Sequence, residues 1–126
     1  NEKELNELQD FSEEYLILDN ENLFIYAAQS EDKFVGYVSI VYIPKVGRKC
    51  NGHLFIDELW VNPHYRKRGI ADALMKKADI LCKEKNISGL RLYVDITNND
   101  ALSLYKKCGY EGKFGTSQFM EKELSN

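Results

Sequence analysis

Hydrophobic and polar positions along the first third of the chain predict one helix and two strands. In residues 1–16, apolar side chains recur at roughly helical spacing among Glu, Asn and Gln, which predicts an amphipathic helix. Residues 23–29 and 34–43 are rich in aromatic and β-branched side chains, and a short polar connection between them predicts an antiparallel hairpin. Pro44 ends the second strand because its nitrogen has no hydrogen to donate to the sheet.

The middle of the chain predicts a strand, a helix and a second strand in succession. Residues 53–61 are almost continuously apolar, which predicts a central strand covered on both faces, and only Asp57 and Glu58 interrupt the pattern. Helical spacing of apolar residues follows over residues 70–85, and residues 90–96 form the next strand. This order implies a right-handed crossover between two parallel neighbours.

A short helix and a hairpin complete the pattern. Residues 100–108 predict the helix, which Gly109 ends, and residues 110–114 and 117–124 predict the two strands of the hairpin. The chain has 126 residues and no linker or repeat, so we expect a single domain over residues 1–126.

Composition and charge exclude several classes of protein. No run approaches the ~20 apolar residues of a membrane span, and the amino end is acidic rather than a signal sequence, so we expect no membrane partner. The formal net charge of -3 argues against a surface built to bind nucleic acid. The three cysteines form no Cys-x-x-Cys pair, so we expect no disulfide framework, no metal site and a cytoplasmic protein.

The turn between the 53–61 strand and the following helix suits an anion. It holds three cationic residues and a glycine, and the helix begins directly after it. Unpaired backbone N–H groups and the positive end of the helix dipole favour a phosphate or pyrophosphate there. Gly69 and the small Ala71 let such a group approach the backbone. On its own this pattern is more often an ordinary solvated loop, and neither a Walker loop nor a dinucleotide motif is present.

Two motifs taken together resemble one enzyme family. The first is Arg66-x-x-Gly69-x-Ala71, and the second is Asn98-x-x-Ala101-x-x-Leu104-Tyr105-x-x-x-Gly109-Tyr110. Their order resembles that of the GNAT superfamily of acyl-CoA-dependent N-acetyltransferases, closely from residue 53 onward and through element order over residues 23–44. The resemblance implies an α/β (α+β) fold with a mixed, mostly antiparallel central sheet flanked by helices and two central strands splayed apart at the cofactor site.

The amino end departs from the family pattern. The family usually opens with a strand before its first helices, and the sequence shows no such strand. The chain begins with Asn1 rather than Met, so we expect that it is part of a longer product. The departure concerns the first edge of the sheet and leaves the cofactor site unaffected.

The resemblance implies acetyl-CoA as co-substrate. Its pyrophosphate would lie in the 66–71 turn, and its pantetheine arm would pair with the preceding strand, where one amide would donate to the thioester oxygen. Asn98 contacts the cofactor by resemblance, although its residue type also fits a helix cap. The implied cofactor-binding residues are Leu59, Trp60, Val61, Arg66, Lys67, Arg68, Gly69, Ile70, Ala71, Asn98 and Tyr105.

Three residues are candidates for proton transfer. The resemblance implies that Tyr105 protonates the leaving thiolate, whereas its residue type alone favours a core aromatic. Asp57 and Glu58 are candidate bases for the amine proton because a carboxylate in an apolar strand is a stronger base unless it is paired. Strand alternation places them on opposite faces, and the parity of acids in the family favours Asp57. The alternative is an acid that only pairs with Arg66 or a loop lysine.

The sequence therefore predicts an enzyme that transfers an acetyl group from acetyl-CoA to a primary amine by direct attack. The cysteines lie away from the 66–71 turn and the 53–61 strand, which disfavours an acyl-enzyme route. Two alternatives remain: a non-catalytic acyl-CoA-binding regulatory module, and a nucleic-acid binder with steeply salt-dependent affinity. The amine is not identified, Trp60 fits either the core or the acceptor pocket, and the predicted partners include a second copy of the chain.

Overall fold

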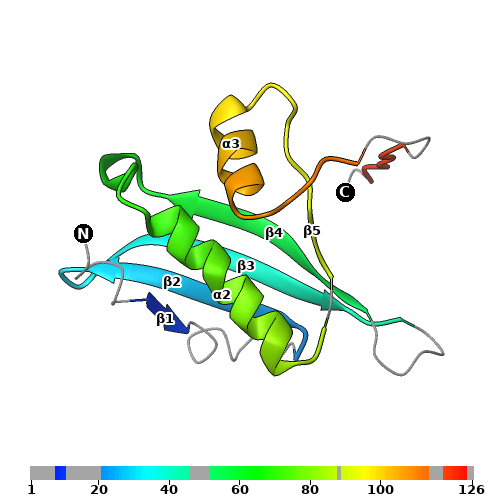
Figure 1. Cartoon of the computed structure of the whole chain (residues 1–126), viewed down its shortest axis with the longest axis horizontal. Coiled ribbons are helices and arrows are strands. Elements are labelled where there is room, and N and C mark those ends of the chain that lie inside the picture. Colours follow the sequence, from blue (N-terminus) through cyan, green and yellow to red (C-terminus); the bar gives the residue numbers. More distant parts are fainter. Residues whose placement is uncertain (1–7, 11–20, 46–51, 88, 114–117, 125–126) are drawn as a thin grey trace.

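One five-stranded sheet, with strand order β1-β2-β3-β4-β5, forms the centre of the molecule (Figure 1). The computed structural model describes residues 8–10, 21–45, 52–87, 89–113 and 118–124. The strands are β1 (Leu8–Asp10), β2 (Leu23–Ser30), β3 (Lys33–Ile43), β4 (His53–Val61) and β5 (Leu90–Leu92). Neighbours are antiparallel from β1 to β4, whereas β4 and β5 are parallel, so the predicted mixed sheet is confirmed.

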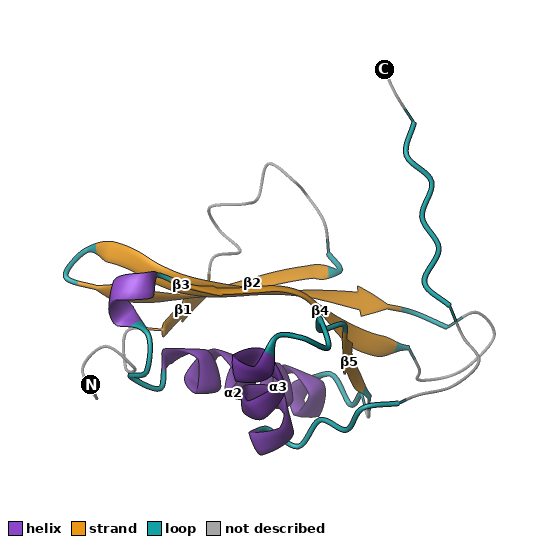
Figure 2. Ribbon diagram, turned by 90° about the horizontal axis from the view of Figure 1, so that it is seen from above, coloured by secondary structure: helices purple, strands orange, loops and turns teal. Residues whose placement is uncertain are grey.

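The helices that follow β4 have the predicted order. A single 3-10 turn, η2 (Pro63–Tyr65), precedes α2 (Ile70–Glu84), and α3 (Asn99–Lys107) follows β5. Seen from above, α2 and α3 lie on the same side of the sheet (Figure 2). Within the described ranges, no helix has the length and apolar content needed to cross a lipid bilayer.

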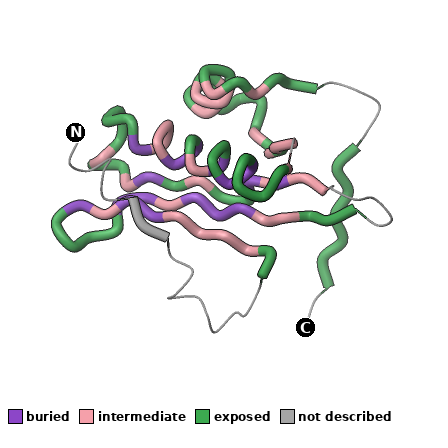
Figure 3. Tube along the Cα trace, turned by 60° about the horizontal axis from the view of Figure 1, so that its bottom comes forward, coloured by how far each residue is buried: buried purple, intermediate pink, exposed green. Residues whose placement is uncertain are grey.

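The hydrophobic core lies between the sheet and α2. Helical periodicity places one apolar stripe of α2 against the strands, and its buried residues are Ile70, Leu74, Met75, Ala78, Leu81 and Cys82. They pack against inward residues of β3 and β4 such as Val38, Ile40 and Leu54. Burial of each large aliphatic side chain contributes roughly 1.5–3 kcal/mol. Figure 3 shows the buried positions along the central strands and α2, whereas α3 and residues 118–124 are mostly exposed.

A β-bulge interrupts β4 beside β3. Ile40 pairs with Ile56 and Ser39 pairs with Glu58, so Asp57 is the extra residue of the bulge. As a result, Ile56 and Leu59 both pack against the core although they are three positions apart. Asp57 and Glu58 lie between these two core-contacting residues and are both exposed, so the bulge interrupts the strict alternation on which their predicted placement on opposite faces depended. The prediction that both faces of this strand are covered is wrong.

The amino end contains a strand that the sequence pattern did not indicate. Residues 8–10 pair with residues 26–28 of β2, so the predicted helix over residues 1–16 is wrong at these positions. Backbone pairing along the edge of β2 outweighs a weak local helical spacing. The other residues of that predicted helix lie outside the described residues.

The carboxyl end also differs from the prediction. β5 ends at Leu92 rather than at residue 96, and residues 110–113 and 118–124 form no strand, so the predicted hairpin is wrong in this part. Its turn lies outside the described residues. β5 offers an edge of only three residues for a further strand, and Phe119, Met120 and Leu124 remain exposed.

Candidate active site

β4 and β5 separate in the region where the cofactor was expected. They pair only through residues 54–56 of β4 and residues 90–92 of β5, and the chain then turns from β5 toward α3 (Figure 1). In the described part of the chain, residues 57–61 of β4 therefore have no strand partner on that side. Unpaired backbone groups of a strand can hydrogen-bond to an extended ligand. The structure thus contains the splay that the resemblance implied.

The turn between β4 and α2 has the backbone of an anion site. Gly69 is the N-cap of α2 with φ 83°, and no side chain caps the helix. The bond from the Ala73 N–H to the Gly69 carbonyl closes the first helical turn, so the preceding amides have no helical acceptor. These N–H groups and the positive helix end favour an anionic ligand. Glycine suits this position because larger residues rarely adopt a positive φ.

The cationic side chains of the turn have different surroundings. Arg66 Nε donates a hydrogen bond to the Val61 carbonyl at 3.3 Å, which ties the turn to the end of β4. In the described structure Arg66 forms no ion pair with the acids of β4, so the Arg66 part of that alternative is not observed, whereas most of the loop that carries the lysines lies outside the described residues. The Arg68 guanidinium lies 4.9 Å from the centre of the Tyr65 ring, and Lys67 is exposed. The turn therefore carries three cationic residues directly before the helix terminus.

α3 carries the second set of predicted residues. Asn98 is its N-cap, and the Asn98 side chain accepts a hydrogen bond from the Ala101 N–H at 3.1 Å, so the capping interpretation is confirmed. Tyr105 is partly buried and contacts Tyr110 edge to face, with 6.1 Å between ring centres. Burial, followed by the charge of Cys108, raises the pKa of Tyr105. A phenol with a raised pKa stays protonated near neutral pH and can act as a proton donor.

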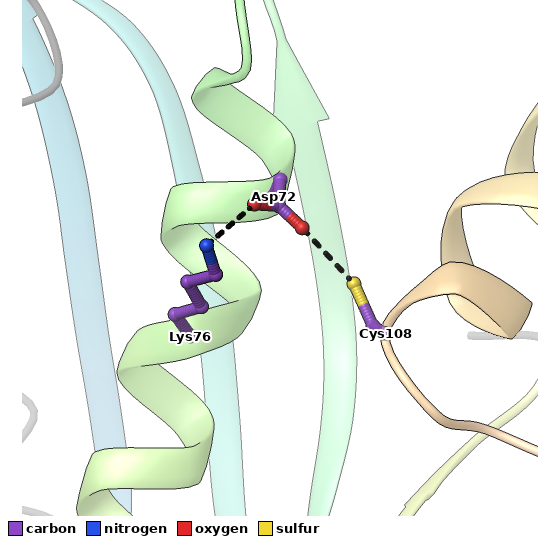
Figure 4. Close-up of polar contacts among 3 residues, drawn as sticks. All are labelled: Asp72, Lys76 and Cys108. Carbon is purple, nitrogen blue, oxygen red and sulfur yellow. Dashed lines mark hydrogen bonds and ion pairs between the residues drawn. The ribbon is translucent and has the colours of Figure 1, made fainter. Parts of the chain in front are cut away.

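A polar contact joins the end of α3 to α2 (Figure 4). The Cys108 thiol donates to Oδ1 of Asp72 at 3.5 Å, and Lys76 Nζ lies 3.0 Å from Oδ2 of the same carboxylate. The hydrogen bond from Lys76 lowers the pKa of Asp72, whereas burial is the main cause that raises the pKa of Cys108. Cys108 is therefore a neutral thiol, which disfavours it as a nucleophile. Sequence reasoning did not identify Asp72.

Glu58 lies on the sheet face opposite α2, beside two aromatic side chains. The Tyr37 hydroxyl donates a hydrogen bond to Oε2 of Glu58 at 2.9 Å. The ring centres of Tyr37 and Trp60 are 6.0 Å apart. Trp60 is 41% exposed, so it is not a core residue. Sequence reasoning missed Tyr37, because its place beside Glu58 depends on the register between β3 and β4.

The loop from β5 to α3 is shaped by its own side chains. The carboxylate of Asp95 accepts hydrogen bonds from the Thr97 N–H at 2.9 Å and from the Thr97 hydroxyl at 2.7 Å. These two bonds lower the pKa of Asp95. Among the described residues, no group of three His, Cys, Asp or Glu side chains is arranged to hold a metal ion.

Comparison with known proteins places this chain in a known family. The model of the acetyltransferase (GNAT) family matches residues 1–110. An uncharacterized N-acetyltransferase of Methanocaldococcus jannaschii is 38% identical over 58 residues, which are 46% of this chain and 26% of that protein. A putative ribosomal protein bS18-alanine N-acetyltransferase of Bacillus subtilis is 38% identical over 56 residues, which are 44% of this chain and 37% of that protein. The matches thus span less than half of these relatives.

A solved structure shares the fold. An aminoglycoside N-acetyltransferase in complex with CoA matches with a TM-score of 0.71 and 16% identity, over 89% of this chain and 85% of that chain. At this level of identity the likeness concerns the fold alone. It confirms the predicted fold, a mixed, mostly antiparallel sheet with flanking helices.

Proposed function

The chain belongs to the acetyltransferase (GNAT) family, and from that membership we propose that it transfers an acetyl group from acetyl-CoA to a primary amine. The observation that carries this proposal is the separation of β4 from β5 directly before an uncapped helix terminus. An extended strand edge followed by an anion site matches the two halves of the co-substrate, an extended pantetheine arm and a pyrophosphate.

The turn before α2 supports the binding of the pyrophosphate. Its residues 66–71 supply the unpaired amides, a glycine with positive φ and the exposed ammonium group of Lys67. The backbone of residues 59–61 then holds the pantetheine arm, and one of its amides donates to the thioester oxygen. Asn98 caps α3 and forms part of the same binding surface. Acetyl-CoA supplies the activated acyl group.

The two faces of the sheet carry different proton-transfer groups. Glu58 lies on the face opposite α2 next to Asp57, whereas Tyr105 lies on the helical side. One carboxylate takes a proton from the ammonium group of the acceptor, and the nitrogen lone pair then attacks the thioester carbon. The carbon–sulfur bond breaks, and Tyr105 gives its proton to the sulfur. The nitrogen loses a second proton, which reaches the phenolate through solvent and restores the phenol, and the carboxylate releases the first proton to solvent.

Acceptor-dependent release of coenzyme A tests this function. Purified protein is mixed with acetyl-CoA and a panel of alkylamines, amino acids, aminoglycosides and peptides, and free thiol is measured over time. We expect release with at least one amine class and little without an acceptor. Saturable binding of acetyl-CoA without any acceptor-dependent release would instead support a non-catalytic regulatory module.

The acceptor is open within the amines, because one fold serves many substrates. The similar proteins are named for different acceptors, an alanine of a ribosomal protein and an aminoglycoside, and both acceptors contain amines. The homodimer stays a prediction, which sedimentation analysis of the purified chain can test.

A further inference from the structure

Two pairs of residues that face each other across β3 and β4 gather on the sheet face opposite α2. Tyr37 pairs with Trp60, and Ser39 pairs with Glu58. The Tyr37 hydroxyl bonds to the carboxylate of Glu58, and its ring lies 6.0 Å from the ring of Trp60. An aromatic wall and a carboxylate are therefore adjacent, next to the bulge where β4 leaves its pairing with β5.

Ser39 adds an unsatisfied polar atom to this group. It is 6% exposed, and its hydroxyl has no hydrogen-bond partner in the described structure. A buried hydroxyl without a partner is costly and is commonly completed by a ligand or a water molecule. Ser39 pairs with Glu58, so this buried hydroxyl belongs to the strand pair that carries the aromatic rings and the carboxylate.

These groups have the chemistry of a site for an organic cation. Faces of Trp and Tyr attract ammonium groups, and the exposed carboxylate of Glu58 accepts their N–H bonds. We propose that Tyr37, Glu58 and Trp60 form the acceptor subsite and that the acceptor is a positively charged alkylamine. The proposal rests on the proposed acetyl transfer and names the substrate class of that site.

Within this subsite the two neighbouring acids have different roles. Tyr37 fixes one oxygen of Glu58 and leaves the other to accept the amine proton, so Glu58 is the base. Asp57 is the extra residue of the bulge and contributes charge without that orientation. Tyr37 is a positioning residue, because it acts on the substrate through Glu58.

Tryptophan fluorescence tests the subsite without any turnover, because Trp60 is the single tryptophan of the chain. The protein is titrated with 1,4-diaminobutane and, separately, with the uncharged 1,4-butanediol. We expect a saturable change with the diamine and none with the diol. Equal responses to both compounds, or no saturable response to the diamine, would overturn the proposal.

Matched variants assign the contacts. Glu58→Gln weakens diamine binding about two- to fivefold, the range of one exposed ion pair, whereas Asp57→Asn removes the same charge from the adjacent position with a smaller effect. Equal losses in both variants would show general attraction to negative charge and contradict the assigned role of Glu58.

The positioning role of Tyr37 is tested by steady-state kinetics with the diamine as acceptor. Tyr37→Phe keeps the ring and removes the hydroxyl, so kcat falls about two- to tenfold while KM for the diamine changes little. Trp60→Leu raises that KM about two- to thirtyfold. Tyr42→Phe and Phe55→Leu are the controls on the same strands, with kinetics expected to match the wild type.

The two proposals fail in different ways. A diamine-specific fluorescence change without release of coenzyme A from any amine leaves the cation subsite in place and overturns acetyl transfer. Release of coenzyme A with uncharged amines, without a diamine-specific fluorescence change, retains acetyl transfer and overturns the cation subsite.

Discussion

At the scale of single residues, Tyr105 in α3 and Tyr110 just after it differ in the surroundings of their hydroxyl groups. Burial raises the pKa of both Tyr105 and Tyr110. The Tyr110 hydroxyl is fully buried and lacks a hydrogen-bond partner among the described residues. The Tyr105 hydroxyl does not belong to this class of buried, unpartnered groups. Only the Tyr105 hydroxyl therefore fits the role of a proton donor to a ligand.

Tyr105→Phe is expected to lower kcat at least about tenfold, because general acid catalysis contributes about 10²–10⁴. The affinity for acetyl-CoA should change little. Since the pKa of Tyr105 is raised above 10.0, the phenol stays protonated and the wild-type-to-variant rate ratio stays constant between about pH 6 and pH 9. A ratio that varies steeply across this interval would contradict the assignment.

Tyr110→Phe is the matched control for that variant. It removes a buried hydroxyl without a partner, so we expect unchanged kcat and a free energy of unfolding that is unchanged or up to about 1 kcal/mol higher. Urea unfolding and the thiol-release assay measure both quantities. A loss of stability above about 1 kcal/mol would show that the hydroxyl has a favourable partner.

Substitution of two glycines with positive φ distinguishes an effect of backbone strain from an effect on ligand binding. Gly69 begins α2 and Gly109 follows α3, with φ of 83° and 97°. Alanine at either position costs roughly 1 kcal/mol of stability. Only Gly69→Ala should raise the Kd of coenzyme A, about three- to tenfold by calorimetry, because Gly69 lies beside the unpaired amides at the start of α2 whereas Gly109 follows the end of α3. Equal binding by both variants would exclude the turn as the pyrophosphate site.

At the scale of elements, the β2–β3 hairpin is closed by an unfavourable pair of turn residues. Glu31 and Asp32 both have positive φ, 50° and 66°, as a type I′ turn requires. Asp32→Gly should raise the free energy of unfolding by about 0.5–1 kcal/mol and the Tm by about 2–4 °C. Scanning calorimetry measures the change, and a lowered Tm would contradict this account of the turn.

The contact from α2 to α3 predicts a dependence of stability on pH. The pKa of Asp72 is lowered in the folded protein, chiefly by Lys76, so its contribution is present above about pH 4 and is lost as pH falls through the lowered value. Asp72→Asn should cost about 0.5–1 kcal/mol at pH 7, from the helix dipole and the pair with Lys76. A difference that persists at about pH 2 would contradict a charge effect.

The elements that depend on local patterns were predicted from the sequence. α2 lies where apolar residues recur at helical spacing, and β4 has the predicted bounds, residues 53–61. The elements at the two ends were not predicted correctly, because their structure depends on pairing with distant strands. Residues 8–10 pair with β2 against their local spacing, and residues 118–124 are not paired despite a strand-like composition.

At the scale of the whole molecule, the proposed site combines groups from both sides of the sheet. Motifs in the sequence identified the turn at Gly69 and the helix with Tyr105, because each is a continuous segment. The relation of Glu58 to Tyr37 could not be predicted, since a single bulge at Asp57 shifts the register and brings both neighbouring acids out of the core. The arrangement around the splayed strands therefore depends on one inserted residue.

Mass spectrometry of the acceptor tests the central claim most directly. The protein is incubated with acetyl-CoA carrying an isotopically labelled acetyl group and with the amine panel, and each amine is analysed for the label. We expect labelled amide product from at least one alkylamine, with at least about tenfold less product for Tyr105→Phe. Bound acetyl-CoA with no labelled product from any amine would contradict the assignment as an acetyltransferase.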